Sequence, residues 1–341
     1  MNPLLKRILG SGVLVAAVIG STACAAGDDE TRSTVDVGGA KVPPRIKIAS
    51  GSVGGAYFPM GNAIAQVISS KLPGVLATGE ASGGSAQNIR MLDGNQIDFA
   101  LSNASITFPA IRGVSDGFEK PYPVRAVITL HSSVNLFLAL KNSGIRTIAD
   151  LRGKRVSVGP AGGGWDAYTK PILQAHGLSF SDFKPVYEGQ SSAVDMLTDG
   201  NVDAIFVGGS IPHATVMSAT AAHEINFVEF DEATLDRISV DYPTIRKFLI
   251  PANTYKGQDK ALWGVDSGAA QLITRADADP DFIYLITKTI YENREMIVKM
   301  TPAGKEITPE RAGMDIGIPY HEGSLRYFKE IDIWHPKTAA P

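Results

Sequence analysis

Two glycine-rich turns hold the residues of this chain that are best placed to bind a ligand. Residues 50–57 read SGSVGGAY and residues 159–165 read GPAGGGW, and each turn follows a short strand-like run. Glycines leave backbone N–H groups uncovered, so a ligand can reach the start of the following helix, where the helix dipole favours negative charge. Tyr57 and Trp165 stand at those helix starts and are expected to face the same ligand. Two such turns that faced each other would form a clamp around an anion.

Other patterns for catalysis or cofactor binding are incomplete. The six histidines, at 131, 176, 213, 223, 321 and 335, show no close pairing, and Cys24 is the only cysteine, so no metal is expected. Residues 181–184 (SDFK) fit SxxK but lack the SDN and KTG partners of such a site. Neither glycine turn contains GKS, GKT or GxGxxG, and no cofactor is expected. We therefore predict a protein that is not an enzyme.

Strands and helices alternate around the turns. Residues 45–49 alternate as a strand should, and apolar residues at helical spacing follow the first turn. The pattern then predicts a helix over 85–92, a strand over 97–101 and a polar exit from that strand. Asn103 and Ser105 lie at this exit, and side chains at the carboxyl end of a strand commonly line a ligand site.

The same unit returns later in the chain. Residues 91–98 (MLDGNQID) align without a gap on residues 196–203 (MLTDGNVD), and a strand over 204–207 follows the second copy. The matched acids Asp98 and Asp203 are expected to be structural, bonding backbone N–H groups nearby. Two copies of one α/β unit predict two lobes.

Apolar segments at 124–130 and 134–140 are expected as strands that carry the chain between the lobes, with the hinge between them. The tail adds a strand over 270–274 and a long amphipathic helix over 280–300, and it is expected to fold back onto the first lobe. The predicted division is lobe I from 45–127 plus 258–341, and lobe II from 128–257.

The amino-terminal stretch has the layout of an export signal. Lys6 and Arg7 precede an apolar run of about 12 residues, which is too short to span a membrane. We therefore predict a signal peptide over 1–23. Cys24 resembles the lipidated cysteine of bacterial lipoproteins, while the small residues around it also fit an ordinary cleavage site.

Composition narrows the partners. The 341 residues are 44% hydrophobic and 20% charged, with a net charge of −3, and loss of the leader would remove the basic residues Lys6 and Arg7 but no acidic residue. A mildly acidic chain is not expected to bind nucleic acid. Residues 24–44 are small, polar and acidic without an apolar period, which predicts a flexible tether and a fold that begins near Pro44.

Motifs along nearly the whole chain beyond the leader resemble the substrate-binding subunits of TRAP transporters, specifically the TAXI branch. Residues 48–61 (IASGSVGGAYFPMG) and 82–88 (SGGSAQN) are similar to that family's opening strand and turn and its next helix start. Residues 143–159 (SGIRTIADLRGKRVSVG) are the most specific piece, and 318–328 (IPYHEGSLRYF) are similar to the closing motif.

The resemblance implies an α/β fold of the two-lobed periplasmic-binding-protein type, type II-like, with its ligand in the interlobe cleft. It implies an exported receptor in the periplasm or on the outer face of the cytoplasmic membrane, where the likeness of Cys24 to a lipoprotein cysteine predicts a lipid anchor. Such a receptor delivers a small organic acid (a dicarboxylate, a 2-oxoacid or a glutamate-like acid) to membrane permease subunits driven by an ion gradient. Together with the turns, it gives the expected ligand-binding residues Gly54, Gly55, Tyr57, Ser85, Asn103, Ser105, Gly162, Gly163, Gly164, Trp165 and Gly209.

Two positions depart from the family's usual pattern. The family's second turn usually reads Gly-Ser-Gly-Thr, whereas residues 162–165 of this chain read GGGW, without either hydroxyl and with the indole of Trp165. The family's first strand exit often has Gln and Asp where this chain has Asn103 and Ser105. Trp165 offers a flat apolar face with one donor, which favours a bulkier or less polar acid. Two other functions stay open on the same scaffold, an exported enzyme that turns the acid over and a ligand sensor that signals to a partner.

Overall fold

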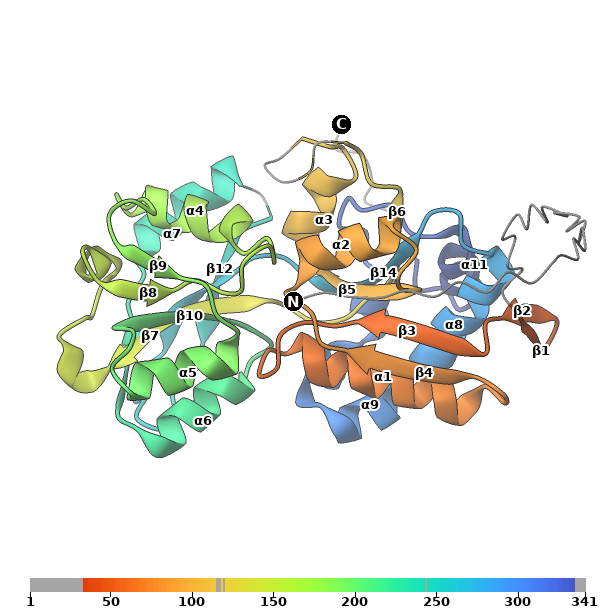
Figure 1. Ribbon diagram of the computed structural model, residues 1–341, viewed down its shortest axis with the longest axis horizontal. Coiled ribbons are helices and arrows are strands. Elements are labelled where there is room, and N and C mark those ends of the chain that lie inside the picture. The colour runs from red at the N-terminus through yellow and green to blue at the C-terminus, as the bar shows by residue number, and fades with distance from the viewer. Residues whose placement is uncertain (1–32, 115–117, 119, 243, 335–341) are drawn as a thin grey trace, which may run out of the picture. The chain divides into compact units, whose positions relative to one another are not determined.

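The computed structural model describes residues 33–114, 118, 120–242 and 244–334. The predicted signal peptide and Cys24 lie outside the described residues. Within the described part, two mixed β-sheets form the centres of two lobes (Figure 1). The first sheet has the order β4-β3-β5-β14-β6, with bounds Leu76–Glu80, Arg45–Ala49, Phe99–Asn103, Ala270–Arg275 and Val124–Thr129. In it β3 runs parallel to β4 and β5, while β14 runs antiparallel to β5 and β6.

The second sheet repeats this plan with a different edge. Its order is β12-β13-β7-β10-β8-β9, and β11 also pairs with β7. Strands β8, β9 and β10 are parallel, and β7 runs antiparallel beside β10. The bounds are Val134–Leu140 (β7), Arg155–Ser157 (β8), Lys184–Val186 (β9), Ala204–Gly209 (β10), Ile225–Val228 (β11), Arg246–Ile250 (β12) and Leu262–Asp266 (β13).

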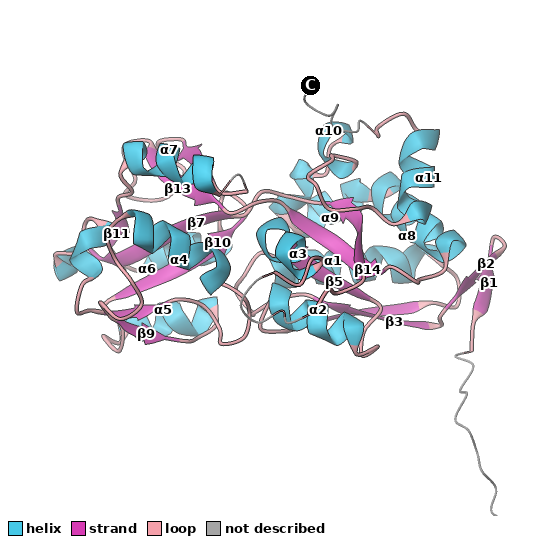
Figure 2. Ribbon diagram, turned by 90° about the horizontal axis from the view of Figure 1, so that it is seen from above, coloured by secondary structure: helices cyan, strands magenta, loops and turns pink. Residues whose placement is uncertain are grey.

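Helices cover both faces of the two sheets (Figure 2). Those of the first lobe are α1 (Tyr57–Lys71), α2 (Ser85–Asp93), α3 (Ala104–Ala110), α8 (Pro280–Glu292), α9 (Arg294–Met300), α10 (Pro309–Ala312) and α11 (Glu322–Glu330). Those of the second are α4 (Asp166–Ala175), α5 (Gln190–Thr198), α6 (Ala214–Ala222) and α7 (Glu232–Asp241). Short 3-10 turns lie at Lys141–Ser143, Ile148–Leu151 and Pro302–Glu306.

Strand β7 shows why its sequence, VNLFLAL, is almost continuously apolar. Leu136 and Leu138 enter one hydrophobic core, whereas Phe137 and Ala139 enter the core on the opposite face. A strand covered on both faces buries successive side chains instead of alternating ones. The polar exception is Asn135, which is buried with 1% of its surface exposed.

The repeat predicted from residues 91–98 and 196–203 is confirmed as a structural framework. In each copy a helix is followed by a strand, and the acid before the strand binds the backbone of the parallel neighbour. Asp98 Oδ2 accepts a hydrogen bond from the Lys47 N–H at 2.9 Å, and Asp203 Oδ2 accepts one from the Arg155 N–H at 2.8 Å. Both acids are therefore structural, as expected from the sequence.

The chain crosses between the sheets twice, from β6 to β7 and from β13 to β14. The two crossovers are hydrogen-bonded to each other, because Ser267 N donates to Ser133 O at 2.9 Å and Ala270 N donates to His131 O at 2.7 Å. Glu306 Oε2 accepts from the N–H and hydroxyl of Ser132 at 2.9 and 3.0 Å. The first crossover lies where the hinge was predicted.

The described part of the predicted tether is folded. Residues Val35–Val37 (β1) and Ala40–Val42 (β2) form an antiparallel hairpin, and Val42 is fully buried in the core of the first lobe. The turn uses Gly38 and Gly39 at φ 63° and 92°, which suits the twist of a two-residue hairpin. The expectation of a flexible tether reaching residue 44 was wrong for this stretch, because alternating apolar residues around a Gly-Gly turn specify a hairpin.

Two further boundaries differ from the prediction. Strand β13 pairs with β12 and β7 in the second sheet, so the chain returns to the first sheet only after Asp266, later than residue 258. The helix expected over 280–300 is divided into α8 and α9 at Asn293. The Asn293 amide donates to the Thr289 carbonyl at 2.8 Å, the kind of local bond by which asparagine competes with a continuing helix.

Candidate ligand-binding site

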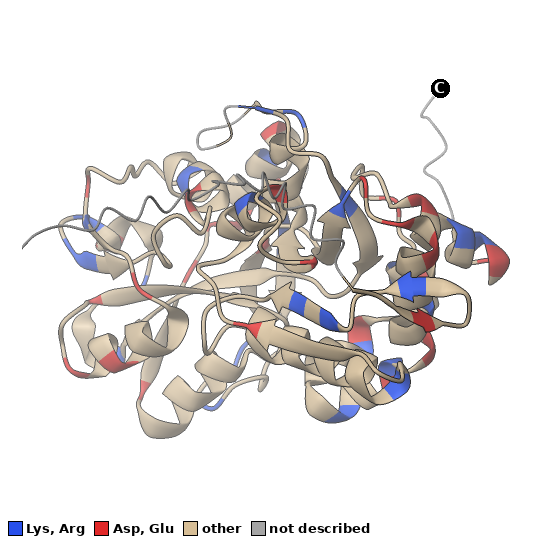
Figure 3. Ribbon diagram, turned by 45° about the vertical axis from the view of Figure 1, so that its right-hand side comes forward, with Lys and Arg blue, Asp and Glu red and all other residues tan. Residues whose placement is uncertain are grey.

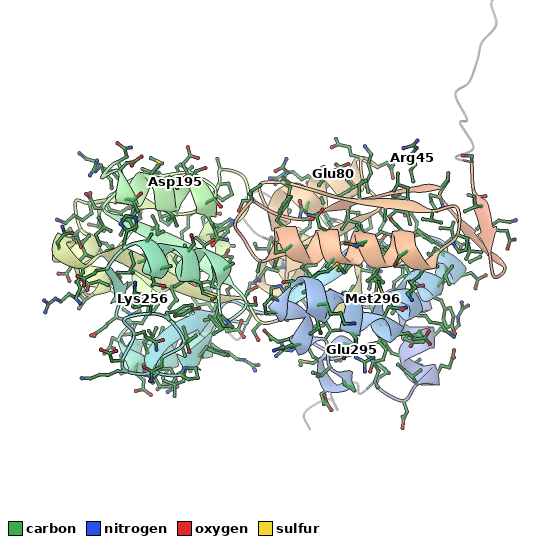
Figure 4. All side chains as sticks on the ribbon, turned by 90° about the horizontal axis from the view of Figure 1, so that it is seen from below. Arg45, Glu80, Asp195, Lys256, Glu295 and Met296 are labelled. Atoms are coloured by element: carbon green, nitrogen blue, oxygen red, sulfur yellow. The ribbon has the colours of Figure 1, made fainter. Side chains whose placement is uncertain are left out.

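About 490 Å³ of empty space, part of it open solvent, lies in a cavity between the lobes. No lysine, arginine, histidine, aspartate or glutamate is among its described lining residues. Figure 3 shows lysine, arginine, aspartate and glutamate residues spread along both lobes, and the side chains of Arg45, Asp195 and Glu295 project from the surface in Figure 4. The lining residues are Gly51, Ser52, Gly55, Ala56, Tyr57, Gly83, Gly84, Ser85, Asn103, Ile106, Ser133, Asn135, Gly163, Trp165, Tyr168, Gln190, Gly208 and Gly209.

Four helices begin at this cavity, and none of them has a side-chain cap. The first residues of α1, α2 and α5 and the N-cap of α4 are among the lining residues, and these four helices lack a capping hydrogen bond. The other described helices of nine residues or more are α6, α7, α8 and α11. Each has a side-chain cap, from His213, Asp231, Asp279 and His321 respectively.

The missing caps give the cavity its electrostatic character. The first N–H groups of a helix have no partner inside the helix, and the helix start carries about half a positive charge. Backbone carbonyls take some of these groups, because Phe58 N, Ala86 N and Ala167 N donate to the carbonyls of Gly55, Gly163 and Gly164. The helix-start N–H groups that are left, together with four helix dipoles, give the cavity donors and a positive potential without a cationic side chain. This arrangement suits the oxygens of an anionic group.

Each lobe holds the end of its central strand with the first side chain of a helix. In the first lobe Ser85 Oγ accepts a hydrogen bond from Asn103 N at 2.9 Å. In the second lobe, 105 residues later, Gln190 Oε1 accepts from Gly208 N at 3.0 Å and its Nε2 donates to Gly208 O at 3.1 Å. The two contacts occupy the same place in the repeat, but glutamine uses both ends of its amide where serine uses one oxygen.

Tyr57 brings a phenol to the first-lobe side of the cavity. Burial raises the pKa of Tyr57 to about 12, and the side chains of Ser133, Ser85 and Asn103 moderate the rise. The hydroxyl therefore stays protonated at neutral pH and can donate a hydrogen bond. Its ring packs edge-on against His131, with 5.9 Å between ring centroids.

Aromatic rings form the second-lobe wall. The Trp165 ring lies 6.0 Å from the rings of both Tyr168 and Phe206, and Tyr168 lies 6.1 Å from Phe206. Burial also raises the pKa of the Tyr168 phenol well above its usual value. No hydrogen bond to the indole N–H of Trp165 is present in the part of the chain that the structure describes, so this donor is available to a ligand.

His213 stands behind Gly208 and helps to fix it. Its Nε2 lies 2.7 Å from the Gly208 carbonyl oxygen, and its Nδ1 accepts from the Thr215 N–H at 3.2 Å. Burial lowers the pKa of His213 to about 4. The neutral ring, protonated on Nε2, therefore donates to the carbonyl and leaves no charge behind this wall.

Seven of the residues predicted to bind a ligand line the cavity, and four do not. Those that line it are Gly55, Tyr57, Ser85, Asn103, Gly163, Trp165 and Gly209. The other four, Gly54, Ser105, Gly162 and Gly164, form contacts between lobes or with a crossover. The carbonyl of Gly54 accepts from Thr215 Oγ1, and that of Gly162 accepts from Arg90 Nη2.

Ser105 and Gly164 are displaced from the cavity for similar reasons. The hydroxyl of Ser105 donates to the carbonyl of Ser267 in the second crossover. Gly164 lies against the first lobe, where an added Cβ would come within 2.9 Å of the Ala86 Cβ and 3.2 Å of the Ile106 Cδ1. Each glycine turn thus faces a helix start of the opposite lobe instead of the other turn.

Sequence reasoning missed several polar lining residues, notably Gln190, Asn135 and Ser133. Gln190 had a usable signal, because extending the gapless repeat backwards aligns it with Ser85. Asn135 and Ser133 had none, since they sit in an apolar strand and a crossover.

Among the described residues there is no group of three or more His, Cys, Asp and Glu side chains that could hold a metal. None of the described helices has the length and apolar character needed to span a membrane.

The two lobes, their paired crossovers and the cavity between them are those of the periplasmic solute-binding fold. A protein of Bordetella bronchiseptica RB50 has this fold with a TM-score of 0.52 at 17% identity, with 87% of this chain and 91% of that chain covered. The alkanesulfonate-binding protein SsuA from Xanthomonas axonopodis pv. citri, bound to MOPS, gives 0.46 at 16%, covering 77% and 82%. The aliphatic sulphonate-binding protein SsuA from Escherichia coli gives 0.40 at 15%, covering 88% and 82%.

A family model describes most of this chain. The NMT1-like family matches residues 48–331, so the chain belongs to the NMT1-like family. The matched range begins within β3, ends just after α11 and includes every lining residue of the cavity.

Proposed function

We propose that this protein is an exported receptor that binds a small organic acid and delivers it to an ion-gradient-driven permease of the TRAP type, TAXI branch. The observation that carries the proposal is the set of four uncapped helix starts around one cavity between the lobes. The helix-start N–H groups that backbone carbonyls leave unpaired are satisfied when an acid brings its oxygens to them.

The motifs at residues 143–159 and 318–328 support the TAXI branch by resemblance. The proposal includes a signal peptide over 1–23, a lipid anchor at Cys24, and a location in the periplasm or on the outer face of the cytoplasmic membrane. The partners are the membrane subunits of the permease. The ligand class is a dicarboxylate, a 2-oxoacid or a glutamate-like acid, and the aromatic wall at Trp165 favours a bulkier member.

Binding would be transmitted to the permease through closure of the lobes. In this structure Ala86 N donates to Gly163 O at 3.2 Å and Arg90 Nη2 donates to Gly162 O at 2.9 Å, so the second-lobe turn is bonded to the first-lobe helix α2. A ligand that bridges the two walls favours this closed arrangement over an open one. The closed receptor is then the form that the permease recognises, and no reaction is needed.

A thermal-shift screen tests the proposal. The full chain, exported with its own leader and purified, is heated with individual organic acids, amino acids and, as a comparison, sulfonates. A ligand that binds only the folded form must raise the melting temperature, by an amount that grows with its concentration. We expect carboxylic acids to raise it. Stabilisation by sulfonates alone would contradict the organic-acid assignment, and chemical turnover of a stabilising acid would favour the enzyme alternative.

A further inference from the structure

Asn135 carries a side-chain amide whose orientation is fixed. Its Nδ2 donates to the Val265 carbonyl at 2.9 Å and to the Ser133 carbonyl at 3.0 Å, and it lies 2.9 Å from Ser267 Oγ. Carbonyl oxygens can only accept, so the NH₂ end must face them. The opposite end, Oδ1, therefore faces away from the crossovers.

The Oδ1 atom of Asn135 lies at the cavity without a donor. Asn135 is 1% exposed and lines the cavity, and no hydrogen bond to its Oδ1 is present among the described residues. This oxygen lies over Gly208, where any added Cβ would collide with it. An amide oxygen that is open only toward the cavity is free to accept a hydrogen bond from a donor that a ligand brings there.

Other amides at the cavity are already satisfied by the protein. Gln190 uses its Oε1 and Nε2 on the backbone of Gly208. Asn103 accepts from Ser105 N at 2.8 Å and donates to Ser267 Oγ and to Gly268 O, both at 3.2 Å. Asn135 is thus distinguished from both by an acceptor that remains open.

We infer that the ligand carries a hydrogen-bond donor, an amino or hydroxyl group, which Asn135 Oδ1 accepts while the helix starts bind the acidic group. This rests on the proposed function and narrows its ligand class to amino acids and hydroxy acids. 2-Oxoacids and unsubstituted acids present no donor at that position and leave the oxygen unpaired. An amide oxygen accepts a hydrogen bond from a neutral hydroxyl and from an ammonium alike, so both kinds of donor satisfy Asn135 Oδ1.

The test compares acids that differ only at carbon 2. One series is L-glutamate, L-2-hydroxyglutarate, 2-oxoglutarate and glutarate; the other is L-phenylalanine, L-phenyllactate, phenylpyruvate and 3-phenylpropionate. Isothermal titration calorimetry of the full exported chain gives Kd for each. In the series that binds, we expect the amino or hydroxy member to bind about tenfold to a hundredfold tighter than its oxo and unsubstituted counterparts.

A substitution assigns the preference to one residue. Asn135→Leu should reduce the spread within the series to about threefold or less, because it removes the acceptor. The matched control is Asn226→Leu on β11, whose amide donates to the carbonyls of Lys141 and Ile145 at 3.4 and 3.1 Å, away from the cavity. Asn226→Leu should keep the wild-type preference.

The outcomes separate the two proposals. Oxo and unsubstituted acids that bind as tightly as the amino and hydroxy acids overturn the inference and leave the receptor function standing. A preference that persists in folded Asn135→Leu overturns the role of Asn135. Absence of binding by all eight acids removes the organic-acid receptor and this inference with it. If Asn135→Leu does not fold, the ratios of Kd within each series for the wild-type protein still decide whether the ligand carries a donor.

Discussion

The two lobes share a framework but present different walls to the cavity. Asp98 and Asp203 bind the neighbouring strand in the same way, and Ser85 and Gln190 hold the strand ends at matching positions. Beyond this framework the first lobe offers the phenol of Tyr57, whereas the second offers aromatic rings around Trp165. The difference teaches that backbone-binding residues preserve the fold, while residues at the turns set the ligand.

The largest effect is expected where the lobes touch. A Cβ on Gly163 would collide with the carbonyl oxygen of Gly83 in the other lobe, so Gly163→Ala should prevent full closure. We expect acid binding to weaken by about tenfold to a hundredfold, or ~1.4–2.7 kcal/mol. Calorimetric titration with an acid from the screen measures this.

Gly189→Ala is the matched control. Its Cβ would only touch the Ser52 Cβ at 3.4 Å, and Gly189 has a negative φ of −66°. Its affinity should stay within about threefold of the wild type. Equal losses in the two variants would show that closure does not depend on the Gly163 contact.

The paired acids should differ in their contribution to stability. Asp98 is 7% exposed, and Asp98→Ala removes the acceptor of the part-buried Lys47 N–H, which should cost about 1–3 kcal/mol of unfolding free energy. Asp203 and Arg155 side chains are 30% and 42% exposed, so Asp203→Ala should cost less, about 1 kcal/mol or below. Urea unfolding of both variants measures the difference, and a larger loss from Asp203→Ala would contradict this ranking.

The aromatic wall should set ligand size. Trp165→Thr replaces the indole with a small hydroxyl, so bulky acids should lose affinity by about tenfold while small dicarboxylates gain or keep theirs. Competition between 3-phenyl-substituted acids and five-carbon dicarboxylates in both proteins gives the ratio. A ratio that does not move would mean that the indole faces no part of the ligand.

A smaller effect concerns pH. The hydrogen bond from the Arg155 side chain lowers the pKa of Asp203 below its usual value. A carboxyl with a lowered folded-state pKa stabilises the fold above its unfolded pKa, and this contribution is lost as pH falls through the folded pKa. The melting-temperature gap between wild type and Asp203→Asn should thus shrink below about pH 4. A melting-temperature difference that widens on acidification would contradict this stabilising role of ionised Asp203.

The smallest expected effect is on the pH dependence of ligand affinity, which should be nearly flat above neutral pH. Because burial raises the pKa of Tyr57 to about 12, its phenol should remain a donor between pH 7 and 10. The affinity for a hydroxy acid should therefore vary by no more than about twofold over that range. A fall near pH 10 in wild type that disappears in Tyr57→Phe would show an ordinary phenol instead.

The sequence predicted the framework well because the framework follows from local sequence patterns. The repeat around Asp98 and Asp203 and the glycine turns predicted two α/β lobes with a cavity bordered by Tyr57 and Trp165. It did not predict that each turn faces the other lobe's helix start, since such contacts depend on how the lobes meet. Asn135 gave no signal, because one polar residue in an apolar strand does not reveal which end of its amide is free.

The paired crossovers have a consequence for how such proteins change. Residues 134–266 leave and re-enter the rest of the chain side by side, with Ser267 N hydrogen-bonded to Ser133 O at 2.9 Å. A segment whose two ends lie side by side resembles a domain inserted into another, so it can be exchanged between homologues without changing the path of the rest of the chain. Grafting this module alone would transplant the aromatic half of the recognition surface and leave the Tyr57 half in place.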